Sequence, residues 1–297
     1  MLKKLPINRI HQSYLHSFEK YIKVSGYGSY HQLLSPVREL FYRIEREGKE
    51  LAQLTSADIA VHQIYLENRP SYRDGGALSM HTISSYFFAL QVFFVFAQKT
   101  GLMTQNPMGT LSLPAIPKTH RQILTKAEIT KLYEVCKTVQ EKAILGMFYG
   151  CGLRRSEGEK LNLRDIDFKG AWLYIRSGKG KKRRVIPLTQ NLIRDFKNYR
   201  YDQRPLQITE QTKGKDQKAF MLNSRGRRML GNTYWKLFKG ILKRSKIDKK
   251  VSLHQLRHSI ATHLLQGGMS IEQVRDFLGH QFLESTQIYT HINPSDL

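Results

Sequence analysis

The chain has 297 residues, and its 48 Lys and Arg against 24 Asp and Glu give a formal net charge of +24 at pH 7. This length predicts two domains, each with its own core, and a hydrophobic fraction of 40% excludes a wholly disordered chain. Because so much positive charge repels itself unless a polyanion is near, nucleic acid is the first partner to expect and an anionic membrane surface the second.

The composition predicts neither export nor membrane insertion. The basic start is not followed by the apolar run of a secretory signal. The most apolar stretch, residues 86–97, is shorter than a bilayer span and predicts a buried helix. The two cysteines, Cys136 and Cys151, are too few for a disulfide framework and form no metal motif. We therefore expect a cytoplasmic protein with reduced thiols, no membrane partner and no metal or cofactor.

The positive charge is unevenly placed along the chain. Residues 1–117 hold 12 Lys and Arg against 8 Asp and Glu, whereas residues 118–297 hold 36 against 16. Between these parts, Pro114 and Pro117 disfavour a helix in a stretch without apolar periodicity. The predicted division is a domain over residues 1–110, an interdomain linker over 111–122 and a second domain over 123–297.

The first domain is predicted to be a helical bundle. Apolar residues recur with helical spacing over 33–47, Thr55 and its neighbours offer N-caps for a helix over 55–67, and a long helix over 79–99 ends near Gly101. Strand signals are weak here, so a small bundle of helices is expected.

The second domain mixes helical and strand periods. Capping boxes, in which a Glu or Gln follows three residues after a Ser or Thr, begin helices at Thr125, Ser252 and Ser270. Further elements are predicted as helices over 141–149 and 234–245, strands over 171–176, 184–188 and 219–222, and a polar loop over 201–218. The expected fold class is therefore mainly α with a small antiparallel sheet (α+β).

Four segments of the second domain contain residues suited to phosphate chemistry. The first is the helix opened by Ser252, in which His254, Arg257 and His258 can share one face. A cation near a helix N-terminus suits an oxyanion, because free backbone N–H groups add to its charge. The alternative is a buried core histidine with a solvated arginine.

The second segment is GCGLRRSEGEKLNL at residues 150–163. Gly150 and Gly152 bring the backbone close to another part of the chain just before Arg154. Glu157 lies three residues later and is placed to orient a catalytic neighbour. The alternative is a helix C-cap followed by a surface helix with ion pairs.

The third segment, SGKGKKRR at residues 177–184, is a tight turn that holds Lys179 between two strands, where it can donate a proton to a leaving oxygen. The basic residues that follow are expected to contact phosphates instead: Lys181, Lys182, Arg183 and Arg184. The fourth segment places His280 at a helix end and Tyr289 nine residues later. A tyrosine of the core is the alternative there.

Together the four segments resemble one family, the tyrosine recombinases or phage-type integrases, of the Xer-like or mobile-element type. The matching motifs are GLRxSE at 152–157, GKG at 178–180, HxLRH at 254–258 and LGHxxxxxTxxYTH at 278–291. They stand in the family's order and at its spacing. The helical first domain is similar to the family's SAM-like core-binding domain, and the second to its catalytic domain.

The resemblance implies a role for each matching residue around the phosphate. Arg154 and Arg257 correspond to two arginines that clamp the scissile phosphate, for which planar guanidinium groups suit bidentate contact. His280 corresponds to a residue that hydrogen-bonds this phosphate. Glu157 corresponds to a carboxylate that orients His254 or an arginine.

Tyr289 corresponds to the nucleophile of the family. Its ordinary pKa of about 10 means that it needs help to lose a proton at pH 7. The resemblance makes His254 the base, or the residue that shares a proton with the phosphate. Lys179 corresponds to the general acid that protonates the departing 5′-oxygen.

The activity implied is site-specific recombination of double-stranded DNA through a 3′-phosphotyrosyl intermediate and a Holliday junction, without ATP or metal. It serves integration, excision, inversion or dimer resolution. The family works as a homotetramer on two DNA sites, with a dimer on each. Accessory DNA-bending proteins and a place on the nucleoid belong to the same expectation.

Two other functions stay open on the sequence alone: a type IB topoisomerase-like enzyme that only relaxes DNA, and a catalytically silent architectural DNA-binding protein. The chain also departs from the family pattern. Gly158 replaces an apolar residue after Glu157, which predicts a loosened helix. The 8 residues after Tyr289 predict a shortened contact with a neighbouring subunit.

Overall fold

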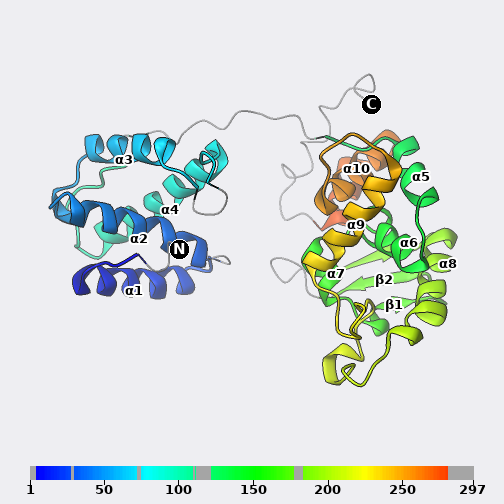
Figure 1. The fold of residues 1–297 in the computed structure, drawn as a ribbon. Coiled ribbons are helices and arrows are strands. Elements are labelled where there is room, and N and C mark those ends of the chain that lie inside the picture. The colour runs from blue at the N-terminus through cyan, green and yellow to red at the C-terminus, as the bar shows by residue number, and fades with distance from the viewer. Residues whose placement is uncertain are drawn as a thin grey trace. The chain divides into compact units, whose positions relative to one another are not determined.

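The computed structural model describes residues 5–27, 30–71, 75–109, 111, 122–176 and 183–279. The chain separates into two compact units, Met1–Thr119 and His120–Leu297. Helices dominate both units, and the sheet formed by the described residues lies in the second (Figure 1). The expected fold class, mainly α with a small antiparallel sheet, is confirmed.

The described residues of the first unit form a bundle of helices: α1 (Arg9–Val24), α2 (Tyr30–Arg46), α3 (Ser56–Asn68) and α4 (Met80–Lys99). Side-chain caps explain where they begin, since Thr55 forms a capping box with Asp58 and the Ser79 hydroxyl caps α4. The helices predicted in this unit are confirmed: 33–47, 55–67 and 79–99. The sequence prediction does not include α1.

Helix α4 forms the core of the first unit. It packs against the other three helices, and its Phe87, Phe93 and Phe94 side chains are almost completely buried. By length and composition it is the one helix in the described part of the chain that could cross a membrane, but half of its most apolar window is buried within the protein. That burial agrees with the predicted core helix.

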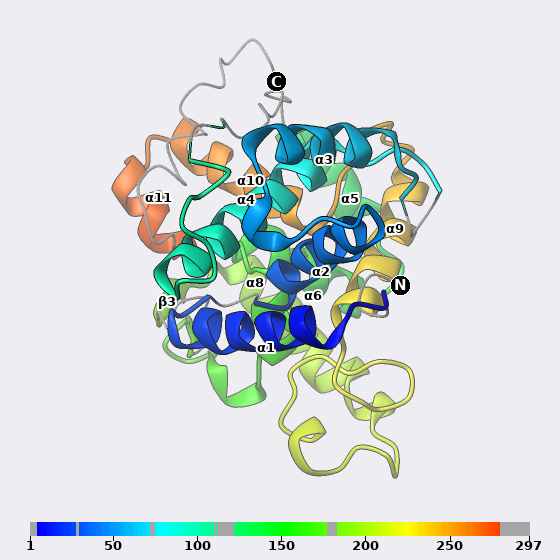
Figure 2. The same cartoon turned by 90° about the vertical axis from the view of Figure 1, so that its left-hand side faces the viewer.

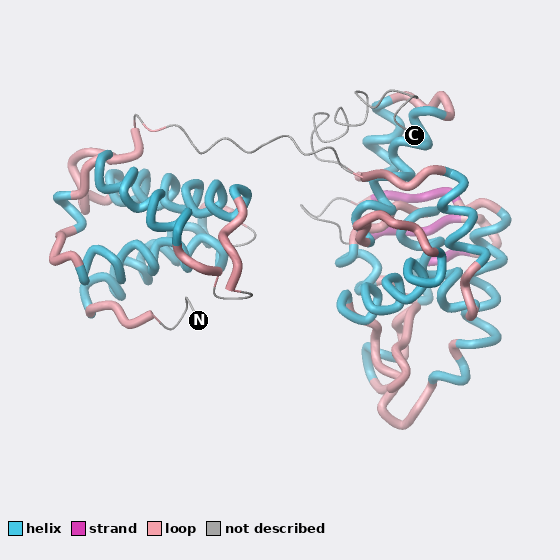
Figure 3. The backbone as a smooth tube through the Cα atoms, turned by 45° about the horizontal axis from the view of Figure 1, so that its top comes forward, coloured by secondary structure: helices cyan, strands magenta, loops and turns pink. Residues whose placement is uncertain are grey.

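Three short antiparallel strands, in the order β1-β2-β3, form the sheet of the second unit (Figure 3). They are β1 (Ile166–Asp167), β2 (Trp172–Ile175) and β3 (Arg184–Pro187). The strands predicted over 171–176 and 184–188 are confirmed. The strand predicted over 219–222 is wrong, because its backbone makes only isolated bridges to Asn162 and Arg228. The third strand is β1.

The helices of the second unit are α5 (Lys126–Glu134), α6 (Val139–Leu145), α7 (Arg155–Lys160), α8 (Gln190–Asn198), α9 (Gly231–Ser245), α10 (Leu253–Gln266) and α11 (Ile271–Leu278). The predicted capping boxes are present at Thr125, Ser252 and Ser270. A π-helical turn over Gly146–Gly150 continues α6. Between α8 and α9, the predicted polar loop folds into short helical turns and extends away from the sheet (Figures 1 and 2).

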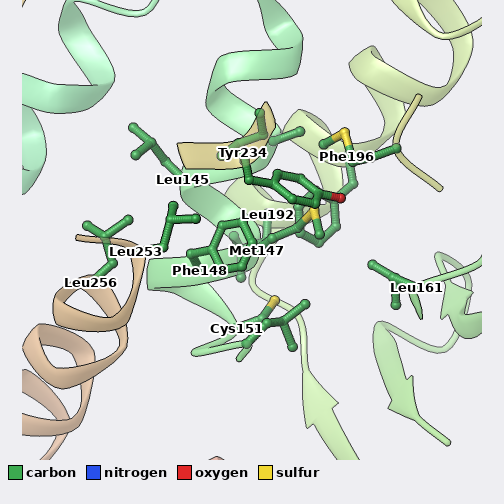
Figure 4. Close-up of a cluster of buried hydrophobic side chains, with 14 of the residues drawn as sticks. Leu145, Met147, Phe148, Cys151, Leu161, Leu192, Phe196, Tyr234, Leu253 and Leu256 are labelled. Carbon is green, nitrogen blue, oxygen red and sulfur yellow. The ribbon is translucent and has the colours of Figure 1, made fainter. Parts of the chain in front are cut away.

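Apolar side chains from α6 and its following turn, α8, α9 and α10 meet in the core of the second unit (Figure 4). Phe148 and Tyr234 pack edge to face with ring centroids 5.1 Å apart, and the Tyr234 hydroxyl donates to the Gly158 carbonyl at 3.2 Å. A Cβ on residue 158 would lie 2.9 Å from Phe148 Cζ. Gly158 is therefore a point of close packing between α7 and this core, and not the loose point that the sequence suggested.

We expect Gly158→Ala to lower the free energy of unfolding by about 1–3 kcal/mol, because the added methyl group overpacks a filled core. Gly240→Ala in α9 is the matched control, since a Cβ there meets Arg244 Nη1 at an ordinary 3.6 Å. The control should gain up to about 1 kcal/mol from replacing a helical glycine. Urea denaturation followed by the two tryptophans, both in the second unit, measures the difference. Equal stabilities would contradict the packing argument.

Candidate active site

Arg154 and Arg257 come from different elements and meet at the end of α11. Arg154 directly precedes α7, and Arg257 lies in α10, which packs beside α11 (orange in Figure 2). Arg257 Nη2 donates to the Leu278 carbonyl at 2.6 Å, and Arg154 Nη2 donates to the Gly279 carbonyl at 3.0 Å. The fold therefore brings the two arginines of the predicted phosphate clamp onto neighbouring carbonyls.

Two glycines let the backbone come close to the two arginines and the end of α11. Gly152 and Gly279 have φ angles of +58° and +64°, in the left-handed region that favours glycine. The Gly152 carbonyl accepts a hydrogen bond from Arg257 Nη1, and a Cβ on residue 152 would lie 2.9 Å from Leu278 Cδ2. The close backbone approach predicted just before Arg154 is confirmed, and the segment that it approaches is α11.

The Glu157 carboxylate is the shared acceptor beneath these arginines. Its Oε1 accepts from Arg154 Nη1 and Arg184 Nη1, both at 2.9 Å. Its Oε2 accepts from the Arg154 backbone N–H and from Arg184 Nη2, also both at 2.9 Å. Each oxygen thus takes one donor from each arginine. Of the two partners weighed from the sequence, an arginine or His254, the structure pairs Glu157 with arginines.

The charge state of Glu157 follows from this environment. Burial alone would raise the pKa of the carboxyl, because only 3% of the residue is exposed. The hydrogen bonds and charge of Arg184, the backbone N–H of Arg154 and the charge of Arg257 outweigh burial and lower the pKa to about 2. Glu157 is therefore ionised at neutral pH.

Arg184 corrects a prediction from the sequence. The sequence places it among the phosphate-contacting residues of a basic loop, but its side chain is only 7% exposed. Its Nε donates to the Phe277 carbonyl at 2.9 Å, in addition to the two bonds to Glu157. Strand alternation could have predicted this burial, because in β3 residue 184 shares a face with Ile186, which is fully buried. Arg183, outside the strand, is exposed as expected.

The histidines of α10 divide between surface and interior. His254 is exposed in the first turn of the helix, and its ring stands edge-on to the buried His258 at a centroid distance of 4.4 Å. Arg257 is only 1% exposed, so the alternative of a solvated arginine at this position is wrong. His254, by contrast, lies at the surface of the protein.

Three predicted site residues lie outside the described residues: Lys179, His280 and Tyr289. Two of them are close in sequence to site residues that the structure describes. Gly279 immediately precedes His280, and Arg184 follows Lys179 by five positions. The roles assigned to these three residues stay predictions.

Comparison with known proteins identifies the family of the chain. Residues 122–296 match the model of the phage integrase family. The chain is 30% identical over 299 residues to the tyrosine recombinase XerC of Oceanobacillus iheyensis, covering 96% of this chain and 93% of that protein. The chain belongs to the phage integrase family. It is also 36% identical over 224 residues to the tyrosine recombinase XerA of Pyrococcus furiosus, covering 74% of this chain and 72% of that protein. The enzyme is therefore a tyrosine recombinase, of the class that carries out site-specific DNA recombination.

Solved structures show the same fold. The Tn1549 transposon integrase in complex with a circular intermediate DNA matches with a TM-score of 0.72 at 19% identity, covering 95% of this chain and 96% of that chain. A lambda integrase dimer bound to a COC′ core site matches with a TM-score of 0.69 at 19% identity, covering 94% of each chain. The fold of this recombinase is thus that of integrases captured on DNA.

The ionised Glu157 side chain should make the stability of the recombinase depend on pH. Its pKa falls from 4.5 to about 2 on folding, so its contribution is complete above pH of about 5 and is lost as the pH falls toward 2. We expect Glu157→Gln to lower the free energy of unfolding at pH 7 by about 3 kcal/mol. The difference from the unmodified chain should shrink between pH 5 and pH 3. Denaturant titrations at fixed pH measure it, and a difference that is constant with pH would be the contrary result.

Proposed function

We propose that Tyr289 of this recombinase attacks a DNA phosphodiester held by Arg154 and Arg257. A P–O bond forms to the tyrosine oxygen, the bond to the 5′-oxygen breaks, and a 3′-phosphotyrosyl link and a 5′-hydroxyl result. The observation that carries the proposal is the pair of guanidinium groups on the last two carbonyls before His280. Two planar cations side by side can share the oxygens of one phosphate as negative charge develops.

The protons move between the phosphate and three side chains. Tyr289 loses its proton to His254 or, through it, to a phosphate oxygen. Lys179 gives a proton to the departing 5′-oxygen, and His280 hydrogen-bonds the phosphate beside the nucleophile. The 21% exposure of the Arg154 side chain supports its direct contact with DNA. The 5′-hydroxyl of a partner strand reverses the reaction and thereby exchanges strands.

Double-stranded DNA is the partner of the reaction, and the charge distribution supports a grip on its backbone. Residues 118–297 carry a net charge of +20, far more than the few cations assigned to chemistry. The first unit would contact DNA as the core-binding domain and the second would carry out catalysis. A homotetramer on two sites, a Holliday-junction intermediate and action on the nucleoid in the cytoplasm complete the proposal.

We expect Tyr289→Phe to abolish covalent attachment to DNA while changing the dissociation constant for DNA less than about threefold, because only the nucleophilic oxygen is removed. The probe is a duplex that the unmodified chain enriches from a random-sequence library, nicked close to the cleavage site so that the adduct is trapped. A denaturing gel measures the adduct. Equal trapping by the Phe variant would refute the assignment of Tyr289.

Lys179→Ala tests the general acid. We expect it to slow cleavage of the ordinary duplex by about 100-fold or more, which is the usual contribution of a positioned proton donor. A duplex with a 5′-thiol leaving group needs no acid, so its cleavage should slow much less. Single-turnover rates on the two duplexes provide the comparison. The same loss on both would assign Lys179 to phosphate binding instead.

A further inference from the structure

We propose that Arg184 is a positioning residue of this recombinase, which acts through Glu157 and the end of α11 to fix Arg154 against the DNA phosphate. The inference rests on the proposed role of Arg154. All three guanidinium nitrogens of Arg184 donate within the protein, Nε to the Phe277 carbonyl and Nη1 and Nη2 to the Glu157 carboxylate. It would therefore act only through the groups that it touches.

Arg184 and Arg154 bind the same two groups, the Glu157 carboxylate and the end of α11. Both residues bind both oxygens of Glu157 at 2.9 Å, Arg184 through Nη1 and Nη2 and Arg154 through Nη1 and its backbone N–H. Both also bind the end of α11, Arg184 at the Phe277 carbonyl (2.9 Å) and Arg154 at the Gly279 carbonyl (3.0 Å). Arg184 thus fixes the two supports on which Arg154 rests.

The packing leaves little freedom for this arrangement to adjust. A Cβ on Gly279 would lie 3.0 Å from Arg184 Cδ, so the α11 end lies directly on the arginine stem. β3 supplies Arg184 from the sheet, whereas Arg154 comes from the start of α7. Arg184 is consequently the side chain that links the sheet, α7 and α11 at the corner where the proposed phosphate clamp forms.

Loss of Arg184 would change the state of Glu157 as well as its position. The carboxylate would keep the two donors of Arg154 and lose the other two while remaining buried. Burial would then raise its pKa, and protonation would remove the charge that holds the Arg154 guanidinium. The groups that face the carboxylate are Arg154, Arg184 and, through its charge, Arg257. A pH-dependent loss of cleavage is the signature expected of such a positioning role.

The test is the single-turnover cleavage rate of the nicked duplex by Arg184→Gln, with Arg244→Gln as the matched control. Arg244 also pairs with a glutamate, Glu141 at 2.6 Å, and donates to a backbone carbonyl, that of Val135 at 3.1 Å. It lies in α9, which is separated from α11 in Figure 2. We expect Arg184→Gln to cleave 10–100-fold more slowly, the usual effect of losing a partner that orients a site residue. Arg244→Gln should stay within threefold of the unmodified chain, and both should bind the duplex within threefold.

The pH profile and a conservative variant separate positioning from simple stabilisation. The cleavage rate of Arg184→Gln, relative to that of the unmodified chain, should decrease further as the pH is lowered from 8 to 5.5. Arg184→Lys restores the charge but not the two-pronged contact, so it should cleave at an intermediate rate, with a relative rate that is constant over this pH range. If Arg184→Gln does not fold, as thermal unfolding would show, the intermediate rate of Arg184→Lys carries the test.

Three outcomes overturn the inference: Arg184 variants that cleave like Arg244→Gln at every pH, a loss explained wholly by weaker DNA binding, or Arg184→Lys at the unmodified rate when the Gln variant does not fold. Failure of the proposed function is distinguishable, because the unmodified chain itself would then form no covalent adduct.

Discussion

The positions of Arg154 and Arg184 in the second unit depend on one buried carboxylate. Glu157 is 3% exposed, and a charge at that depth is unfavourable unless it is paired and fully hydrogen-bonded. Arg154 and Arg184 meet that condition with four donors, two on each oxygen. Removing either partner would leave an uncompensated charge, so the pair constrains where β3 and the start of α7 can lie. The ion pair is better understood as a means of fixing geometry than as a source of net stability.

The end of α11 provides the second constraint. Its successive carbonyls at Phe277, Leu278 and Gly279 accept from Arg184, Arg257 and Arg154, respectively. The final carbonyls of a helix lack intrahelical partners and carry the negative end of its dipole, so they attract cations. Three arginines from three elements thus align on one helix end. The chain then continues directly into the segment that contains His280 and Tyr289.

The sequence predicts the elements of this site better than their interior contacts. Caps such as Thr55, Thr125 and Ser252 locate helix starts because a short-range side-chain bond determines them. The spaced motifs locate Arg154, Glu157 and Arg257 because the family's chemistry uses these residue types in this order. Both kinds of signal are local or familial, and neither requires knowledge of which side chains meet in space.

The predictions that the structure corrects depend on contacts between elements. Arg184 looks like the other cations of its basic run, and only the alternation of β3, together with a partner 27 residues earlier, shows that it is buried. Gly158 looks like a weak point until Phe148 is seen against it. Residues 219–222 have strand composition, but their neighbours are loops. Each error concerns a contact with another element, which the residue composition of the segment alone does not record.

The central claim is that Arg184 and Glu157 act on the reaction as one unit. A double-mutant cycle of Arg184→Gln and Glu157→Gln, measured as single-turnover cleavage of the nicked duplex, tests it most directly. The account predicts that the double variant cleaves no more slowly than the slower single variant, so the two losses are coupled by about tenfold or more. Losses that multiply in the double variant would show that the two residues act independently, and would contradict the account.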